Sequence, residues 1–356
     1  MRLGLVGPLP PPNGGMAMQT LQLARLLAEE GIAVDLVQTN APYRPKAAGK
    51  IKGLRAVFRL VPYLWQIWRL AGRTDVIHLM ANSGWSWQLF AAPVIWIGWL
   101  RKTPVIVNYR GGEAREYLAT SAKWVKPSMT RASRLVVPSG FLQRVFSEVN
   151  LSPTVIPNII DLELFQPPSQ PPSDTVFTLV VTRNLEPIYG LATAIRAIAL
   201  ARGQVPQIQL KIAGSGPQGA ELKRLVASLG LENEVFFLGR LDRTEIVELY
   251  HSANAMLNPT RVDNMPNSLL EALACGLPVI STNVGGVPYI VEDEQTALLV
   301  APDNEQEMAQ AIVRLFEDAD LRRQLSERGR REVAQYAWAE VWPRWRAVYN
   351  SPAVAA

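Results

Sequence analysis

The sequence predicts an α/β protein made of two Rossmann-like domains that face each other across a cleft. Short apolar runs that suit buried strands alternate with longer segments of helical spacing along the whole chain. This alternation occurs twice, and a proline- and serine-rich stretch, QPPSQPPSD at residues 166–174, separates the two series. In each half a glycine-bearing loop follows the first strand. A chain of 356 residues is long enough to bury two cores.

Composition narrows the class of protein. With one cysteine and two histidines, neither a disulfide framework nor a zinc site is expected. The opening run MRLGLVG stops at Pro8, so no secretory signal is indicated. The longest apolar run, residues 89–100, is shorter than the ~20 residues that cross a bilayer. We therefore expect a cytoplasmic protein that is not integral to a membrane.

The first element, a buried strand at residues 2–7, leads into a loop that suits phosphate. Gly14 and Gly15 lie at the start of the following helix and remove side chains where a diphosphate could approach the backbone. The spacing is not G-x-G-x-x-G, so a dinucleotide site is not indicated. A role of the two glycines in the turn alone is the alternative.

After the second strand, residues 32–38, the chain becomes basic. Between Asp35 and Asp75 it has eight basic residues and no acidic one. Apolar residues, among them Trp65 and Trp68, are interleaved near helical spacing, and Pro62 is expected to kink or restart the helix. Such a helix suits either peripheral contact with an anionic membrane or an ordinary core position with a solvated basic edge. No RNA- or DNA-binding motif accompanies the charge, so nucleic acid is not expected as a partner. The basic residues are Arg44, Lys46, Lys50, Lys52, Arg55, Arg59, Arg69 and Arg73.

Two further strands complete most of the first sheet. Residues 75–80 contain His78, which we expect to be a satisfied core histidine, and lead to Trp85 and Trp87. These tryptophans could stack on an acceptor or pack in the core, and we expect packing. The strand at residues 103–109 leads directly to Arg110.

The second half contains the most informative stretch, RVDNMPNSLLEALACGLPVISTNVGG at residues 261–286. Asp263 and Glu271 lie eight residues apart, and a helix start, with Asn264 as the expected cap, falls between them. A helix N-terminus suits a diphosphate, whereas carboxylates accept hydrogen bonds from sugar hydroxyls. A sugar nucleotide offers both groups. Gly285 and Gly286 then form a turn where the backbone is expected to approach a ligand. The alternative is an ordinary αβ unit.

This stretch resembles the donor-site signature of family 4 retaining glycosyltransferases, in which two acidic residues flank seven others and ALACGLPVI and a Gly-Gly turn follow. Most members have glutamate at the first acidic position, where this chain has Asp263. PNIIDLELFQP, residues 157–167, resembles the linker of the family. The resemblance implies the GT-B fold, with an acceptor-binding domain at 1–165, a nucleotide-sugar-binding domain at 174–337, and a terminal helix at 338–356 that packs back on the first domain.

The resemblance also implies which residues bind the donor. Arg183 would grip the diphosphate, but Tyr189 stands where the family has lysine, and Arg110 stands where it has a histidine facing the transferred sugar. We expect Arg110 to compensate for the missing charge. Glu271 would hold the ribose and Asp263 the hexose. The predicted catalytic residues are Arg183, Asp263 and Arg110, and the predicted donor-binding residues are Gly14, Gly15, Arg183, Tyr189, Gly214, Gly216, Leu241, Asp263, Asn267, Ser268, Leu270 and Glu271.

The function implied is transfer of a hexosyl group from a UDP- or GDP-sugar to a hydroxyl of a glycan or lipid-linked sugar, with retention and without a metal or cofactor. Cell-surface polysaccharide or glycolipid synthesis at the inner face of the membrane is the expected setting. Two alternatives stay open. A non-catalytic sugar-nucleotide-binding protein is suggested by Tyr189 and Arg110, and a sugar-nucleotide epimerase of GT-B fold would cleave the same bond.

Overall fold

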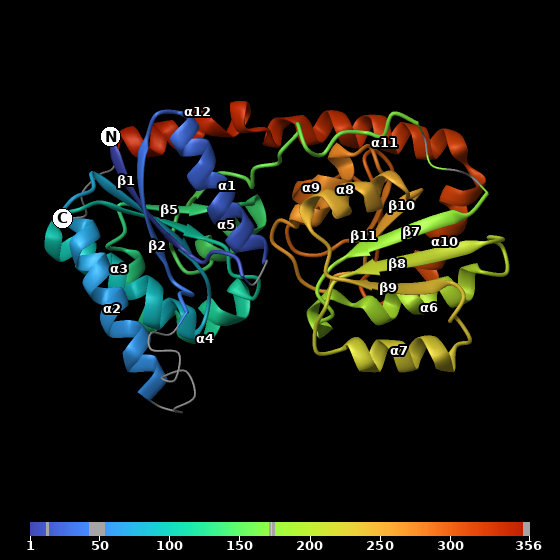
Figure 1. The fold of residues 1–356 in the computed structure, drawn as a ribbon, viewed down its shortest axis with the longest axis horizontal. Coiled ribbons are helices and arrows are strands. Elements are labelled where there is room, and N and C mark those ends of the chain that lie inside the picture. The colour runs from blue at the N-terminus through green and yellow to red at the C-terminus, as the bar shows by residue number, and fades with distance from the viewer. Residues whose placement is uncertain (12–13, 43–53, 171, 173–174, 352–356) are drawn as a thin grey trace. The chain divides into compact units, whose positions relative to one another are not determined.

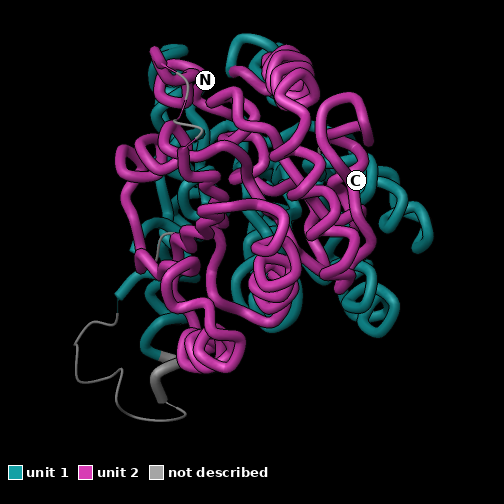
Figure 2. The backbone as a smooth tube through the Cα atoms, turned by 90° about the vertical axis from the view of Figure 1, so that its right-hand side faces the viewer, with its two compact units in different colours: residues 1–159, 338–356 teal, residues 160–337 magenta. Residues whose placement is uncertain are grey.

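The computed structural model describes residues 1–11, 14–42, 54–170, 172 and 175–351. The chain forms two compact units, residues 1–159 with 338–356 and residues 160–337 (Figure 2). The division falls before Ile160, earlier than the expected domain end at 165. Ile160 and Phe165 belong to the second unit because both are buried in its core.

The first unit is built on a six-stranded sheet with the order β2-β1-β3-β4-β5-β6. All neighbouring strands are parallel, so their carboxyl ends lie at one edge. Strand order reverses between β1 and β3, which is where sheets of this type bind ligands. The strands are β1 (Arg2–Gly7), β2 (Ala33–Gln38), β3 (Val76–Ala81), β4 (Val105–Tyr109), β5 (Arg134–Val137) and β6 (Thr154–Val155).

Helices cover both faces of this sheet, because alternate strand residues are apolar on either side (Figure 1). One face packs against α2 (Leu54–Ala71), α3 (Ala92–Arg101), α4 (Ala114–Met129) and α5 (Gly140–Ser147), and the π-helical turn Trp87–Ala91 precedes α3. The other face packs against α1 (Gly15–Glu29) and α12 (Trp338–Asn350).

The terminal helix α12 returns to the first unit, as the fold prediction required. Its side chains Val341, Trp345 and Tyr349 are buried in the same core as β1 and α1. The indole N–H of Trp338 also donates to Glu30 of the first unit at 2.9 Å. Burial of these large aromatic side chains explains why the helix packs here.

The second unit repeats the design with the order β12-β11-β10-β7-β8-β9, again with parallel neighbours. Its strand order reverses between β7 and β10. The strands are β7 (Phe177–Thr182), β8 (Ile208–Ala213), β9 (Val235–Gly239), β10 (Ala255–Asn258), β11 (Val279–Thr282) and β12 (Leu298–Val300). The helices are α6 (Leu191–Ala201), α7 (Gly219–Ser228), α8 (Arg243–His251), α9 (Asn267–Ala274), α10 (Glu305–Glu317) and α11 (Ala319–Val333), with 3-10 turns at Pro187–Tyr189, Val287–Tyr289 and Ala334–Tyr336.

The prediction of an α/β protein with two Rossmann-like units is confirmed. One local expectation differs from the structure: Pro62 does not restart its helix, since α2 runs through it from Leu54 to Ala71. None of the helices in the described ranges combines the length and apolar character needed to span a bilayer.

Candidate functional site

The carboxyl edge of the second sheet brings together several of the predicted residues. Arg183 follows β7, Asn258 ends β10, and the loop that carries Asp263 leads from β10 to α9. Because β7 and β10 are the two strands at which the order reverses, their ends flank the position where α/β sheets bind ligands.

Arg183 and Asp263 form an ion pair at this edge. Arg183 Nη2 donates to Asp263 Oδ2 at 2.5 Å, and both side chains are only 11–12% exposed. Arg183 Nε and Nη2 also donate to Asn258 Oδ1 at 3.2 and 2.9 Å. Within the described chain, Arg183 Nη1 and Asp263 Oδ1 make no hydrogen bond. The pair is thus held in place while one edge of each group stays available to a ligand.

Tyr189 lies beside this pair. The guanidinium carbon of Arg183 is 5.1 Å from the centre of the Tyr189 ring, which is cation–π geometry. Burial is the main reason why the pKa of the Tyr189 hydroxyl is raised, although the charge of Arg183 opposes this effect. Tyr189 therefore keeps a neutral side chain next to Arg183 and supplies no second positive charge.

Glu271 is linked to the end of β7 by Tyr250, a residue of α8 whose hydroxyl contacts both. The Tyr250 hydroxyl lies 3.3 Å from Glu271 Oε2 and 2.7 Å from Thr182 Oγ1, at the end of β7. Burial raises the pKa of the Glu271 carboxyl, while Arg243, the Tyr250 hydrogen bond and Arg183 act in the opposite direction. Glu271 and Arg183 therefore belong to one group of interacting side chains.

The start of α9 differs from the prediction. The helix begins at Asn267 with Pro266 at the N-cap position, and no side chain caps it, so the expected cap by Asn264 is wrong. A proline at this position has no side-chain oxygen to offer the first turn. Ser268 Oγ is buried and has no hydrogen-bond partner among the described residues. An unpaired buried hydroxyl at a helix N-terminus suits an anionic ligand. Leu270, by contrast, places its side chain in the core.

The two glycines that end the motif have a structural role that the sequence did not indicate. A Cβ at Gly286 would lie 1.7 Å from the Asn264 carbonyl oxygen, and one at Gly285 would lie 2.1 Å from the Asp263 oxygen. The Gly286 N–H donates to Asp263 O at 2.8 Å. The turn therefore packs against the loop that carries Asp263, and the expected approach of its backbone to a ligand stays a prediction.

Gly214 and Gly216 act in the same way on the loop that carries Arg183. Gly214 has φ +154, and a Cβ there would lie 1.9 Å from the Arg183 carbonyl oxygen. A Cβ at Gly216 would lie 2.4 Å from the Leu185 oxygen. Both loops are thus fixed by backbone contacts. Leu241 is partly buried against the core near α8.

In the first unit, Arg110 follows β4 and is oriented by two amides. Its Nε donates to Asn108 Oδ1 at 3.3 Å, and its Nη2 donates to Asn158 Oδ1 at 2.5 Å. Burial lowers the pKa of the guanidinium to about 10, so Arg110 stays charged at neutral pH. An arginine in this position cannot act as a base, but it can hold a sugar hydroxyl or a phosphate oxygen.

His78 is a buried core residue, as expected. Asn108 Nδ2 lies 3.2 Å from His78 Nε2, and Tyr349 Oη lies 2.7 Å from His78 Nδ1. Burial and the charge of Arg110 lower its pKa to about 3, so the imidazole is neutral. The neutral ring links Arg110, through Asn108, to the terminal helix.

The other predicted features of the first unit have mixed outcomes. Gly14 precedes α1, and a Cβ there would meet nothing within 4 Å, so packing of the chain does not require glycine. Gly15 is the first residue of α1.

Trp87 is buried, and its indole N–H donates to Ser128 Oγ at 3.1 Å, as expected for packing. Trp85 is 77% exposed, so the expectation of packing was wrong for it. Its neighbour Gly84 has φ +67, in the left-handed region that glycine adopts readily.

Sequence reasoning missed four residues that hold predicted site residues: Asn258, Tyr250, Asn108 and Asn158. Asn258 and Asn108 had a usable signal, since an asparagine near the end of an otherwise apolar strand lies close to the edge where ligands bind. Tyr250 and Asn158 lie on segments distant in sequence from their partners.

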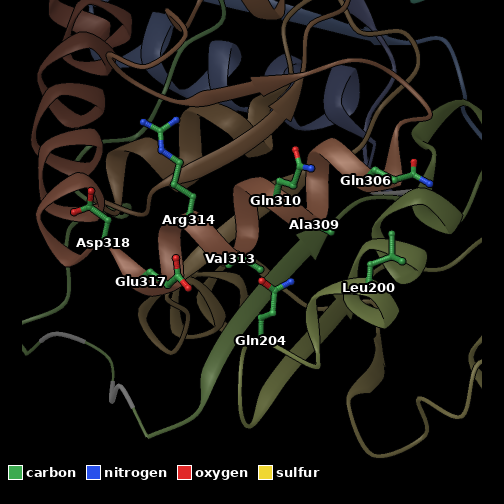
Figure 3. Close-up of a pocket in the computed structure, with 9 residues that line it drawn as sticks. All are labelled: Leu200, Gln204, Gln306, Ala309, Gln310, Val313, Arg314, Glu317 and Asp318. Carbon is green, nitrogen blue, oxygen red and sulfur yellow. The ribbon is translucent and has the colours of Figure 1, made fainter.

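A surface groove of about 570 Å³ lies elsewhere on the second unit, where α6 and α10 meet (Figure 3). Leu200 and Gln204 line it on one side, and residues of α10, including Gln310 and Arg314, line it on the other. No predicted site residue lines this groove. No group of three or more metal-ligating side chains is found within the described ranges.

Comparison with known proteins supports the resemblance. A family model described as "Glycosyl transferases group 1" matches residues 164–332, and one described as "Glycosyltransferase Family 4" matches residues 13–164. The two matches adjoin and together cover most of both units.

Two curated relatives illustrate the range of similarity. The phosphatidylinositol N-acetylglucosaminyltransferase gpi3 subunit of Schizosaccharomyces pombe is 31% identical over a region covering 56% of this chain and 43% of that protein. The D-inositol 3-phosphate glycosyltransferase of Mycolicibacterium smegmatis is 26% identical, covering 95% of this chain and 86% of that protein. The chain spans less than half of the length of several curated relatives that it matches.

Solved structures share the whole fold. Sucrose-phosphate synthase from Thermosynechococcus elongatus has a TM-score of 0.80 at 24% identity and covers 98% of both chains. The Anabaena protein HepE, solved with UDP, has a TM-score of 0.78 at 20% identity and covers 99% of this chain and 100% of that one. With family models matching both halves and GT-B structures matching its full length, the chain belongs to glycosyltransferase family 4 and has the GT-B fold.

Proposed function

We propose that the protein transfers a hexosyl group from a UDP- or GDP-sugar to a hydroxyl of a glycan or lipid-linked acceptor, with retention and without a metal. The observation that carries this proposal is the Arg183–Asp263 pair, in which one edge of each group is left without a hydrogen bond in the described chain. A guanidinium edge fits the diphosphate of such a donor, and a carboxylate edge fits the hydroxyls of its sugar.

The donor would extend along the carboxyl edge of the second sheet. Arg183, the N-terminus of α9 and the hydroxyl of Ser268 would bind the diphosphate, and Glu271 would accept hydrogen bonds from the ribose. Negative charge grows on the diphosphate as the sugar departs. Positive charge and N–H groups already fixed at that position stabilise the transition state more than the ground state.

In this proposal, the ion pair of Asp263 with Arg183 is the reason for expecting retention at the anomeric carbon. Its carboxylate is held by Arg183, so it is a poor nucleophile and is better suited to hold the hexose. We propose displacement on one face: the bond from the anomeric carbon to the phosphate oxygen breaks, and the acceptor oxygen bonds to the same face. The acceptor proton then passes to the leaving phosphate oxygen. NMR of the product, showing the same anomeric configuration as in the donor, tests this step.

The function itself is tested by measuring nucleotide release from a panel of UDP- and GDP-sugars, with and without lipid-linked acceptors. UDP-glucose is the first donor to try, because structures of HepE contain UDP and UDP-glucose. Release that depends on acceptor supports transfer. Binding without turnover of any pair would favour the non-catalytic protein, and release of an altered sugar without acceptor would favour the epimerase.

Arg110 is included in the catalytic machinery of this proposal. Replacing Arg110 by alanine is expected to lower kcat/KM by roughly 10- to 150-fold, the effect of losing one charge-assisted hydrogen bond of about 1.5–3 kcal/mol. Steady-state kinetics with and without added guanidinium ion measures the loss and its rescue. A purely structural role through Asn108 and Asn158 would lower the unfolding temperature without rescue, and unchanged turnover and donor affinity would remove Arg110 from the site.

Glu271 should make donor binding depend on pH. Because the pKa of its carboxyl is raised, the group becomes protonated at a higher pH than an ordinary glutamate as the pH falls, and it then loses acceptor capacity for ribose hydroxyls. The affinity for UDP-glucose is therefore expected to decrease as the pH is lowered from about 8 to about 5. Calorimetric titration measures it, and the sugar nucleotide is preferred to UDP, whose terminal phosphate titrates near pH 6.

Glu271→Gln is the control for this pH effect. The amide cannot titrate, so we expect weaker binding with the pH dependence removed. An equal slope in Glu271→Gln and in the unmodified protein would assign the pH effect to another group.

A further inference from the structure

Helix α2 in the first unit is apolar on two opposite sides. Tyr63, Ile67 and Leu70 are buried against the sheet, which is the core position that the sequence allowed. On the outer side, Val61, Trp65 and Trp68 recur at helical spacing and are 61%, 58% and 46% exposed. A helix on the surface of a globular domain normally presents polar residues outward. Packing in the core therefore does not explain the apolar side chains on the outer side of α2.

The apolar surface continues onto α3, which packs beside α2 (Figure 1). At the end of α3, Trp99 and Leu100 are 41% and 61% exposed. The rings of Trp96 and Trp99 meet edge to face, with centroids 6.0 Å apart. Exposed large apolar side chains gathered on adjacent helices mark an interaction surface, whereas single ones do not.

Arginines are placed directly on these indoles. Arg69 lies 4.7 Å from the centre of Trp65, and Arg101 lies 4.7 Å from Trp68, bridging α3 to α2. Arg131, just after α4, lies 4.4 Å from Trp96 and 5.4 Å from Trp99. We call the whole set the tryptophan–arginine surface: Val61, Trp65, Trp68, Arg69, Trp96, Trp99, Leu100, Arg101 and Arg131.

The charge of this surface has one sign. Neither α2 nor α3 contains an acidic residue, and Asp75 is the one acid in the sequence between residues 54 and 101. Its carboxylate accepts a hydrogen bond from the backbone N–H of Arg2 at 2.7 Å. In the part of the chain that the structure describes, Arg69, Arg101 and Arg131 form no ion pair, and Arg131 donates only to the neutral carbonyl of Pro127. These three positive charges are therefore available to an anionic partner.

We propose that the tryptophan–arginine surface docks on an anionic lipid bilayer. Indole rings combine an apolar body with an N–H group and concentrate at the boundary between lipid headgroups and acyl chains. The arginines beside them would meet lipid phosphates. None of its residues lines the groove between α6 and α10. An exposed helical face that is both apolar and positively charged fits the plane of an anionic lipid surface, where the indoles and the charges can be satisfied together.

The tryptophan–arginine surface differs from the basic segment for which the sequence predicted membrane contact. The basic residues Arg44, Lys46, Lys50 and Lys52 of the expected membrane segment lie outside the described residues. The surface that the structure shows depends instead on α2, α3 and Arg131, and it does not depend on the proposed catalytic function.

Co-sedimentation of the full chain with vesicles tests the proposal. With vesicles of phosphatidylglycerol and phosphatidylcholine at low salt, the protein is expected to pellet, and with phosphatidylcholine alone it is expected to remain largely in the supernatant. Each basic residue near an anionic surface contributes about fivefold to partitioning. Arg69→Glu/Arg101→Glu is therefore expected to reduce the partition coefficient onto these vesicles by at least about 25-fold. High salt should reduce the partition coefficient of the unmodified protein.

Tryptophan variants separate lipid docking from general attraction of charge. Trp65→Ser/Trp99→Ser removes two half-exposed indoles and keeps every charge, and it is expected to reduce partitioning by about tenfold or more. Arg224→Glu/Arg330→Glu, on exposed positions of the second unit, is the matched control and should pellet like the unmodified protein. Circular dichroism and thermal unfolding establish that each variant is folded.

Three results would overturn the proposal. They are absence of pelleting with anionic vesicles, equal pelleting of Trp65→Ser/Trp99→Ser and the unmodified protein, and an equal loss in Arg224→Glu/Arg330→Glu. The first would point to a protein or nucleic-acid partner, and the other two to attraction of charge without docking through this surface.

Discussion

Arg183→Ala is expected to lower kcat/KM by about 10²–10³-fold, the usual effect of removing one fixed group that stabilises developing charge. The variant also leaves Asp263, which is 12% exposed, without its positive partner. A buried carboxylate without its partner is unfavourable, so the unfolding temperature should fall as well. Initial rates at varied donor concentration, together with thermal unfolding, measure both effects.

Arg183→Lys distinguishes charge from geometry at this position. Lysine keeps the charge but cannot donate to Asn258, Asp263 and a phosphate in one plane, so we expect an intermediate loss. Because the residues of the pair act as a unit, Arg183→Ala/Asp263→Asn should lose less than the product of the two single losses.

The control for Arg183 is an exposed ion pair of the same unit. Arg314 and Glu294 are each about half exposed, and such pairs contribute little to stability. Arg314→Ala should therefore retain near-normal activity. Retention of more than about a third of the activity in Arg183→Ala would remove Arg183 from the catalytic machinery.

Gly286→Ala is expected to reduce kcat/KM by about 10²-fold or more, although Gly286 need not touch the donor. Its new Cβ would lie 1.7 Å from the Asn264 oxygen and 2.6 Å from the Asn264 carbonyl carbon. Backbone atoms cannot yield as the end of a side chain can, so the Asp263–Asn264 segment must move by about 1 Å or more. A displacement of that size in a catalytic group can cost about 10²-fold in rate.

Stability should respond in the same variant. Forcing a backbone shift in a packed region costs about 1–3 kcal/mol, which lowers the unfolding temperature by a few degrees to about 10 °C. Gly203→Ala is the matched control, because a Cβ there meets nothing within 4 Å. Normal activity and normal unfolding temperature in Gly286→Ala would show that the turn does not fix the Asp263 loop.

Much of the candidate site could be predicted from the sequence because its signals are local. The eight-residue spacing of Asp263 and Glu271, the apolar helix that starts between them and the strand that follows are patterns of neighbouring residues, and the resemblance to the family rests on the same residues. The cap of α9 was predicted wrongly for a related reason. Asn264 is a good capping residue by type, but its loop is held by Gly286 and the helix starts later, at Asn267.

The amino-acid sequence alone determined the two α/β units, the family and the candidate acid pair Asp263 and Glu271. Apolar periodicity and short motifs depend only on neighbours along the chain. Tertiary structure decided that Arg183 pairs with Asp263, 80 residues away, and that the outer tryptophans of α2 and α3 share one surface. The physical reason is that such partners are selected by which strands and helices lie side by side, and β7 adjoins β10 only in the folded sheet.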